Sequence, residues 1–126
     1  MRIDVSIIIV NYNTLQLTLN CIHSIIQKTS HIKYEIIVVD NASTDGSREV
    51  LEKEPNIRYF YSTENLGFGK ANNLGYKFAS GSYLFLLNSD TVLLNNAIEA
   101  LYLFMENHRE VAIAGGSLYN EIIYKA

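Results

Sequence analysis

The stretch Tyr83-Leu84-Phe85-Leu86-Leu87-Asn88-Ser89-Asp90-Thr91 carries the strongest structural signal in this chain. Its first five residues are apolar or aromatic, which is typical of a strand buried in a sheet. The run stops at Asn88 and Asp90, which place two oxygen-bearing side chains directly after the strand. In open α/β sheets ligands bind at the carboxyl ends of the strands, so a ligand is expected here. Short polar residues also form ordinary turns, and this segment alone leaves both interpretations open.

Short apolar runs of the same kind recur along the chain and are separated by longer amphipathic stretches. Because β-branched and other apolar residues dominate these runs, they predict strands that are covered on both faces. The predicted strands are Val5–Val10, Ile36–Val39, Ile57–Tyr61, Tyr83–Leu87 and Val111–Ala114.

The stretches between the first strands have the spacing of helices. Leucine and isoleucine recur at intervals of four, three and four residues within Leu15–Ile26, which predicts a helix capped by Asn13 or Thr14. A short second helix is expected to end near Lys53, because the single proline that follows cannot continue it.

Two later helices complete the pattern. One is predicted at Gly67–Ala79 and ends at Gly81, and the other begins after a cap at Asn95 or Asn96. Strands and helices therefore alternate, which predicts an α/β fold: a Rossmann-like, mostly parallel sheet with helices on both faces. The residues expected to face the core from these two helices are Ala71, Leu74 and Phe78, and Ala97, Leu101 and Phe104.

The composition indicates one globular domain. Of the 126 residues, 48% are hydrophobic and 18% are charged, which suits a packed core. The net charge of -3 and the lack of a basic stretch argue against nucleic-acid binding. The single cysteine, Cys21, excludes an internal disulfide and suits a reducing compartment. No apolar run reaches the roughly 20 residues of a membrane helix, so we expect a cytoplasmic protein, with peripheral association at the inner face of the membrane left open.

Polar clusters follow three of the predicted strands, and in a parallel sheet they would line one edge and form a candidate pocket. Asp40 would accept hydrogen bonds from a nucleobase or a ribose, and the Tyr12 ring would stack on a base. The oxygens of Asn88 and Asp90 suit Mg²⁺ or Mn²⁺, which could hold a diphosphate. Asp40 could equally form a local turn, and Tyr12 could be an ordinary half-buried tyrosine. The clusters are Asn11-Tyr12-Asn13, Asp40-Asn41-Ala42-Ser43 and Asn88-Ser89-Asp90.

The segment Gly67-Phe68-Gly69-Lys70-Ala71-Asn72-Asn73 opens the third predicted helix. Its glycines permit close approach of the backbone, and a helix N-terminus attracts anions, so a phosphate could lie near it. The spacing partly mimics a dinucleotide-binding fingerprint, but Asn72 stands where the third glycine is needed.

Four segments, in this order and at this spacing, form a recognisable set: Val5-Ser6-Ile7-Ile8-Ile9-Val10-Asn11-Tyr12-Asn13, Glu35-Ile36-Ile37-Val38-Val39-Asp40-Asn41-Ala42-Ser43-Thr44-Asp45-Gly46, Asn65-Leu66-Gly67-Phe68 with Ala71-Asn72-Asn73-Leu74-Gly75, and Leu86-Leu87-Asn88-Ser89-Asp90-Thr91. They resemble glycosyltransferase family 2 with the GT-A fold, and most closely its bacterial rhamnosyltransferase-like branch. The resemblance covers Val5 to about Gly116.

The resemblance implies an inverting transferase that moves a sugar from a nucleotide-diphosphate donor to a glycan or lipid-linked acceptor, in cell-surface polysaccharide synthesis. Asp90 and Asn88 would hold Mn²⁺ or Mg²⁺. Asn88 stands where the family motif has its first aspartate, so Asp90 would be the main anionic ligand. Residues 1–126 would form the nucleotide-sugar-binding portion, and the catalytic base would lie beyond residue 126 in an acceptor-binding part. The residues that would surround the nucleotide are Asn11, Tyr12, Asn13, Asp40, Asn41 and Asn73.

Other functions are weighed against this one. A non-catalytic nucleotide-binding module of a larger assembly is the alternative, because nothing here matches the base. A dinucleotide-dependent oxidoreductase would need a glycine-rich turn where Asn11-Tyr12-Asn13 stands, and a phosphoacceptor domain would need acidic residues there. Apolar residues near the C-terminus could drive self-association into a homo-oligomer. They are Tyr119, Ile122, Ile123 and Tyr124.

Overall fold

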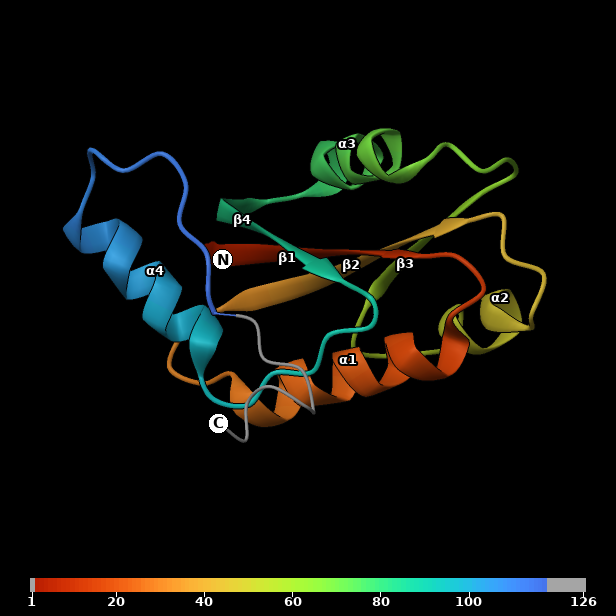
Figure 1. The fold of residues 1–126 in the computed structure, drawn as a ribbon, viewed down its shortest axis with the longest axis horizontal. Coiled ribbons are helices and arrows are strands. Elements are labelled where there is room, and N and C mark those ends of the chain that lie inside the picture. The colour runs from red at the N-terminus through yellow and green to blue at the C-terminus, as the bar shows by residue number, and fades with distance from the viewer. Residues whose placement is uncertain (1, 118–126) are drawn as a thin grey trace.

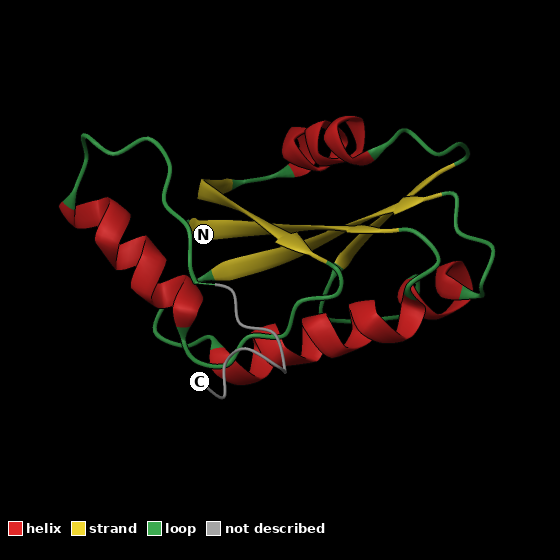
Figure 2. Ribbon diagram, viewed as in Figure 1, coloured by secondary structure: helices red, strands yellow, loops and turns green. Residues whose placement is uncertain are grey.

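The structure, a computed structural model, describes residues 2–117. Strands and helices alternate along the chain, as the apolar pattern predicts (Figures 1 and 2). Among the described residues, no helix is long and apolar enough to cross a membrane. The elements are β1 (Ile3–Asn11), α1 (Leu15–Lys28), β2 (Tyr34–Asn41), α2 (Ser47–Leu51), β3 (Arg58–Ser62), α3 (Phe68–Phe78), β4 (Gly81–Asn88) and α4 (Ala97–Asn107).

The strands of the described part form one parallel sheet in the order β3-β2-β1-β4. The chain adds β2 and β3 on one side of β1, then returns across the sheet to add β4 on the other side. Helices α1 and α2 lie on one face and α3 on the opposite face (Figure 1). The predicted α/β fold is therefore confirmed. The strand order reverses between β1 and β4, which is the place where open α/β sheets bind ligands.

Alternate residues of the strands build two apolar layers, one on each face of the sheet. Cys21 belongs to the larger layer, where burial and the negative charge of Asp90 raise the pKa of its thiol to about 12. It is a neutral core residue. The larger layer, on the α1 face, includes Val5, Ile7, Ile9, Cys21, Ile22, Ile25, Ile36 and Val38. The smaller layer, on the α3 face, is formed by Ile8, Ile37, Val39 and Ala71.

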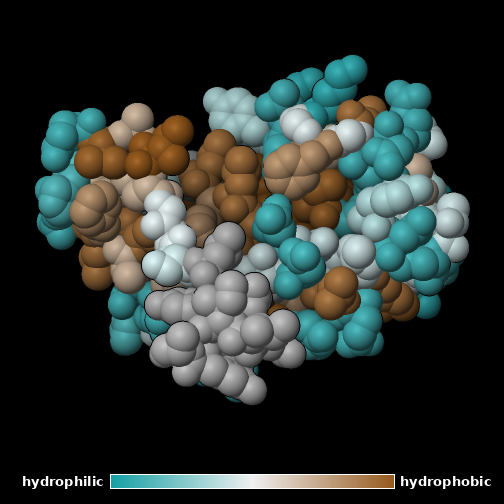
Figure 3. Space-filling model, in the orientation of Figure 1, coloured by the Kyte–Doolittle hydropathy of each residue, from teal (hydrophilic) through white to brown (hydrophobic). Residues whose placement is uncertain are grey.

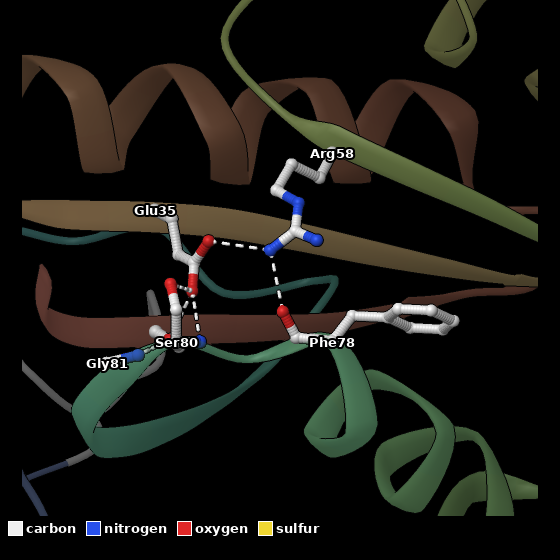
Figure 4. Close-up of polar contacts among 6 residues, drawn as sticks. Glu35, Arg58, Phe78, Ser80 and Gly81 are labelled. Carbon is white, nitrogen blue, oxygen red and sulfur yellow. Dashed lines mark hydrogen bonds and ion pairs between the residues drawn. The ribbon is translucent and has the colours of Figure 1, made fainter.

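A charged cluster ties the strands together near their amino ends (Figure 4). The Glu35 carboxylate accepts hydrogen bonds from the Ser6 hydroxyl at 2.6 Å and from the N–H and hydroxyl of Ser80 at 2.7 and 2.8 Å. Arg58 donates to Glu35 at 2.9 Å and to the carbonyl oxygen of Phe78 at 2.6 Å. Burial alone would raise the pKa of Glu35, but these bonds outweigh it and lower the pKa to about 2. The cluster therefore connects β1, β2, β3 and the start of β4.

Gly81 begins β4 instead of ending α3, so the prediction of a helix-terminating glycine is wrong. Helix α3 ends at Phe78, and Ala79 is its C-cap. The N–H of Gly81 donates to the Ser6 hydroxyl at 2.7 Å, and a Cβ on Gly81 would stand 2.5 Å from the Ser6 backbone nitrogen. The glycine is required because β1 and β4 approach closely at this point.

Two predictions for the C-terminal third are also wrong. Val111–Ala114 forms a loop and no strand, and Ile113 is 88% exposed. An apolar run becomes a strand only where a neighbouring strand pairs with it. In α4, Ile98 is the buried residue, whereas Phe104 is exposed and stacks on His108. The apolar residues at positions 119 to 124 lie outside the described residues.

Candidate functional site

The three polar clusters meet at one edge of the sheet. Asn11 and Asp40 are register partners at the ends of β1 and β2, and Asn88 pairs with Val10 at the end of β4. The segments that follow these strands therefore lie together at the point where the strand order reverses (Figure 1). This edge, the rim, comprises residues 11–14, 40–46 and 88–91.

Asn11 lies at the centre of the rim, but its side chain is completely buried. Its amide oxygen accepts hydrogen bonds from the hydroxyls of Thr18 at 2.6 Å and Thr14 at 3.1 Å. Its amide nitrogen donates to the hydroxyl of Ser43 at 3.1 Å. Both polar atoms thus have protein partners, so the buried Asn11 side chain connects the segment after β1 to the segment after β2.

Asp40 is also completely buried. One carboxylate oxygen accepts the N–H of Ser43 at 3.1 Å, and the other accepts a short hydrogen bond from the Tyr59 hydroxyl on β3. Burial and the nearby Asp40 raise the pKa of the Tyr59 hydroxyl, so it stays protonated and able to donate. The structure thus places Asp40 in the floor of the rim, held from two sides.

Asn41 points to the opposite face of the sheet, toward α3. Its amide oxygen accepts the N–H of Leu66 at 3.1 Å, and its amide nitrogen donates to the carbonyl oxygen of Gly67 at 3.2 Å. It is buried, and both polar atoms of its side chain are bonded. Asn41 therefore holds the turn that starts α3.

Asn73 lies on α3 and lines a groove of about 280 Å³ between α3 and β4. Figure 3 shows apolar side chains gathered between α3 and α4, where β4 is exposed. The groove lies on the α3 face of the sheet, so the structure does not bring Asn73 next to the buried pair Asn11 and Asp40. The other lining residues are Ile8, Asn72, Tyr76, Leu84 and Leu86.

Tyr12 and Asn13 are the exposed members of the first cluster. Tyr12 directly follows β1 and is 49% exposed, so its ring is available for stacking. Asn13 adopts a left-handed backbone conformation with φ 52°. Its side-chain oxygen accepts the N–H of Thr44 at 2.7 Å, and its own N–H donates to Ser43 at 2.9 Å. These contacts join the two neighbouring segments at the surface of the rim.

Asn88 and Asp90 are both exposed, and they flank Ser89 in a tight turn that the N–H of Thr91 closes onto the carbonyl oxygen of Asn88 at 3.1 Å. The hydroxyls of Ser89 and Thr14 lie 3.3 Å apart, which links this turn to the segment after β1. Within residues 2–117, no group of three or more histidine, cysteine, aspartate or glutamate side chains could hold a metal ion. Mg²⁺ and Mn²⁺ in phosphate-binding sites commonly use one or two protein oxygens, with phosphates and waters completing the shell. Asn88 and Asp90 offer two exposed side-chain oxygens of the kind that such an ion uses, and binding of an ion by them stays a prediction.

Three residues that organise the rim were missed as site residues by sequence reasoning: Thr14, Asp45 and Tyr59. Thr14 and Asp45 lie in polar runs directly after strands, and that position is a signal that could have identified them. Tyr59 carries no such signal, because it is one of nine tyrosines and lies inside a strand. Only the pairing of β3 with β2 brings its hydroxyl to Asp40.

Residues 6–122 match the model of a family described as glycosyl transferase family 2. The chain belongs to this family. This family member is 33% identical over 119 residues to TuaG, a proposed teichuronic acid biosynthesis glycosyltransferase of Bacillus subtilis, and the match covers 90% of this chain and 47% of TuaG. It is 36% identical over 107 residues to an uncharacterized glycosyltransferase of Rickettsia bellii, covering 82% of this chain and 15% of that protein.

Solved structures share the fold. Residues 1–349 of S. aureus TarS in complex with UDP give a TM-score of 0.75 at 25% identity, covering 85% of this chain and 33% of that chain. The same part of TarS in complex with UDP-GlcNAc gives 0.71 at 24% identity, covering 85% and 32%. These matches confirm the GT-A fold. The family 2 chain described here spans less than half the length of TuaG and of the TarS fragment.

Proposed function

We propose that this chain is the nucleotide-sugar-binding part of an inverting glycosyltransferase that transfers a sugar from a nucleotide-diphosphate donor to a glycan or lipid-linked acceptor. The observation that carries the proposal is the rim, where an exposed aromatic ring, Tyr12, and two exposed oxygen-bearing side chains, Asn88 and Asp90, follow the strands at the reversal point of the sheet. The UDP and UDP-GlcNAc complexes of TarS support a nucleotide-sugar donor. The similarity to TuaG supports a role in cell-surface polysaccharide synthesis.

In this proposal the nucleoside lies against the segments after β1 and β2, with its base on Tyr12. The diphosphate points to Asn88 and Asp90, where Mn²⁺ or Mg²⁺ would be held. When bound, that ion would neutralise the charge that develops on the leaving diphosphate. The chain's own part is to orient the donor so that its anomeric carbon faces the acceptor.

The transfer itself is a single displacement. A hydroxyl oxygen of the acceptor forms a bond to the anomeric carbon while the bond from that carbon to the diphosphate oxygen breaks, and the configuration inverts. In this proposal the hydroxyl proton goes to a general base in the acceptor-binding part of the enzyme. Such a base contributes about 10²–10⁴-fold to the rate.

Titration calorimetry with UDP- and dTDP-sugars, with and without Mn²⁺, tests the proposal. We expect binding that depends on Mn²⁺ and weakens about tenfold or more in Asp90→Ala, because the main anionic ligand is lost. Glu110→Ala, which removes an exposed carboxylate after α4, is the matched control and should bind like the wild type. A folded sample that binds none of these donors contradicts the proposal. Donor binding without transfer by a chain that includes the acceptor-binding part would favour a non-catalytic nucleotide-binding module.

A further inference from the structure

Asp45 connects the starts of two helices that follow different strands. One of its carboxylate oxygens accepts the N–H of Leu15, the first residue of α1, at 3.2 Å. The other accepts the N–H of Ser47, the first residue of α2, at 3.0 Å, together with a short hydrogen bond from the Ser47 hydroxyl. The first N–H groups of a helix lack partners within the helix, and the Asp45 side chain accepts one such N–H from each of the two helices.

The same two segments are joined by further hydrogen bonds. The Ser43 hydroxyl accepts from the backbone N–H of Asn13 and from the side chain of Asn11, and Asn13 accepts the N–H of Thr44. With the bond between Asp45 and Leu15, four hydrogen bonds cross from residues 11–15 to residues 43–45. The bond to Asp45 is the one that reaches furthest along α1.

Backbone conformation shows why these segments need such bonds. Asn13 has φ 52° and Ala42 has φ 64°, so two residues other than glycine lie in the left-handed region. That region is unfavourable for residues with a Cβ, and such conformations persist only where the surrounding structure holds them. The cross-linking hydrogen bonds supply that restraint on both sides of the rim.

We propose that Asp45 is a positioning residue for the donor: it locks residues 11–15 and 42–46 into one preformed wall against which the nucleoside binds. The proposal rests on the proposed function, because it assigns that wall to the nucleoside. Because the wall is preformed, donor binding loses less conformational entropy than it would if two loops first had to become ordered.

Two variants separate this role from a local structural one. Asp45→Ala removes the bond that crosses between the segments, whereas Ser47→Ala removes a hydroxyl bond that stays within the β2–α2 connection. With Mn²⁺ present, we expect Asp45→Ala to weaken UDP binding about tenfold and Ser47→Ala to change it less than about twofold. Binding of Mn²⁺ alone, followed by electron paramagnetic resonance, should be the same in all three proteins.

Hydrogen exchange gives a readout that needs no ligand. The N–H of Thr44 is bonded to Asn13 and not to Asp45, so a purely local role of Asp45 would leave its exchange rate unchanged. If Asp45 locks the segments, Asp45→Ala speeds exchange at Thr44 as well as at Leu15. Should Asp45→Ala fail to fold, Asp45→Asn replaces it. We expect it to weaken UDP binding and to speed exchange at Thr44 and Leu15 by smaller factors, because the amide keeps only one acceptor oxygen.

The outcomes distinguish the two proposals. A wild-type chain that binds no UDP overturns both the proposed function and the role of Asp45. A wild-type chain that binds UDP, with an Asp45→Ala variant that binds it equally well and shows unchanged exchange at Thr44, overturns the role of Asp45 alone.

Discussion

Asn11 and Asp40 are register partners across β1 and β2, and neither side chain reaches solvent. Each is held by hydroxyl or amide groups of the protein, Asn11 by Thr18 and Asp40 by Tyr59. The pair therefore forms the floor of the rim, while the exposed Tyr12 lies at its surface. A direct contact of Asn11 or Asp40 with the nucleotide stays a prediction.

The hydroxyl of Tyr59 should stabilise the fold through Asp40. Tyr59→Phe removes a donor from a carboxylate oxygen that has no access to solvent, so we expect the free energy of unfolding to fall by about 1–3 kcal/mol. Urea denaturation measures it. Tyr61→Phe is the control, because the Tyr61 ring lies under Arg48 with the guanidinium 4.0 Å from the ring centroid, and this contact does not depend on its hydroxyl. Equal stability of the two variants would contradict the role assigned to Tyr59.

Replacement by alanine should destabilise the fold at Gly81 and stabilise it at Gly69. A Cβ at Gly81 would lie 2.5 Å from the backbone nitrogen of Ser6, so β4 must shift, at a cost of about 1–3 kcal/mol. A Cβ at Gly69 on α3 would meet nothing within 4 Å, and alanine there should add up to about 1 kcal/mol through helix propensity. The midpoints of thermal and urea unfolding should therefore fall in Gly81→Ala and rise in Gly69→Ala. Midpoints that shift in the same direction in both variants would count against the close approach of β1 and β4.

The contribution of Glu35 should depend on pH. Its pKa lies near 2, below the ordinary value of 4.5, so its stabilising effect is complete above about pH 4.5 and disappears as the pH falls toward 2. Glu35→Gln should lower the free energy of unfolding by about 1–3 kcal/mol at pH 7, since charged hydrogen bonds to Ser6 and Arg58 are weakened. The difference from the wild type, measured by denaturation at a series of pH values, should shrink between pH 4.5 and 2. Glu64→Gln, at an exposed position, should show no such dependence.

The charge at the end of β4 should set the affinity for Mn²⁺. Asp90→Asn removes the anionic ligand and should weaken Mn²⁺ binding about tenfold, whereas Asn88→Asp adds a second carboxylate and should strengthen it by a similar factor. The double variant Asn88→Asp/Asp90→Asn keeps the net charge and should bind nearly as the wild type does. Titration followed by electron paramagnetic resonance measures all four proteins. An unchanged affinity in Asp90→Asn would remove Asp90 from the metal site.

The fold was predictable because its central strands depend on local chemistry. The β-branched runs of β1 and β2 favour buried strands wherever they are placed, and the observed strands only extend the predicted ones by one or two residues at each end. Val111–Ala114 has a similar composition and formed no strand, because a strand also needs a partner that is distant in sequence. The prediction for Gly81 failed for the same reason, because its role depends on Ser6, which is distant in sequence and lies on the neighbouring strand.

The location of the site was predictable, but the direction of its side chains was not. The ends of parallel strands share an edge, so Asn11, Asp40 and Asn88 had to come near one another. Whether a residue at a strand end is buried depends on the loop that folds over it, as the segment around Ser43 does here. Alternation also sends Asn41 to the other face, where it holds the start of α3.

The exposed ring of Tyr12 offers a direct optical probe. The chain contains no tryptophan, so Tyr12→Trp would introduce a single indole at the surface of the rim. Its emission could be excited apart from the tyrosines, and a base stacked on the ring would quench it. Fluorescence during rapid mixing would then give the association and dissociation rates of a donor, without emission from the other aromatic residues.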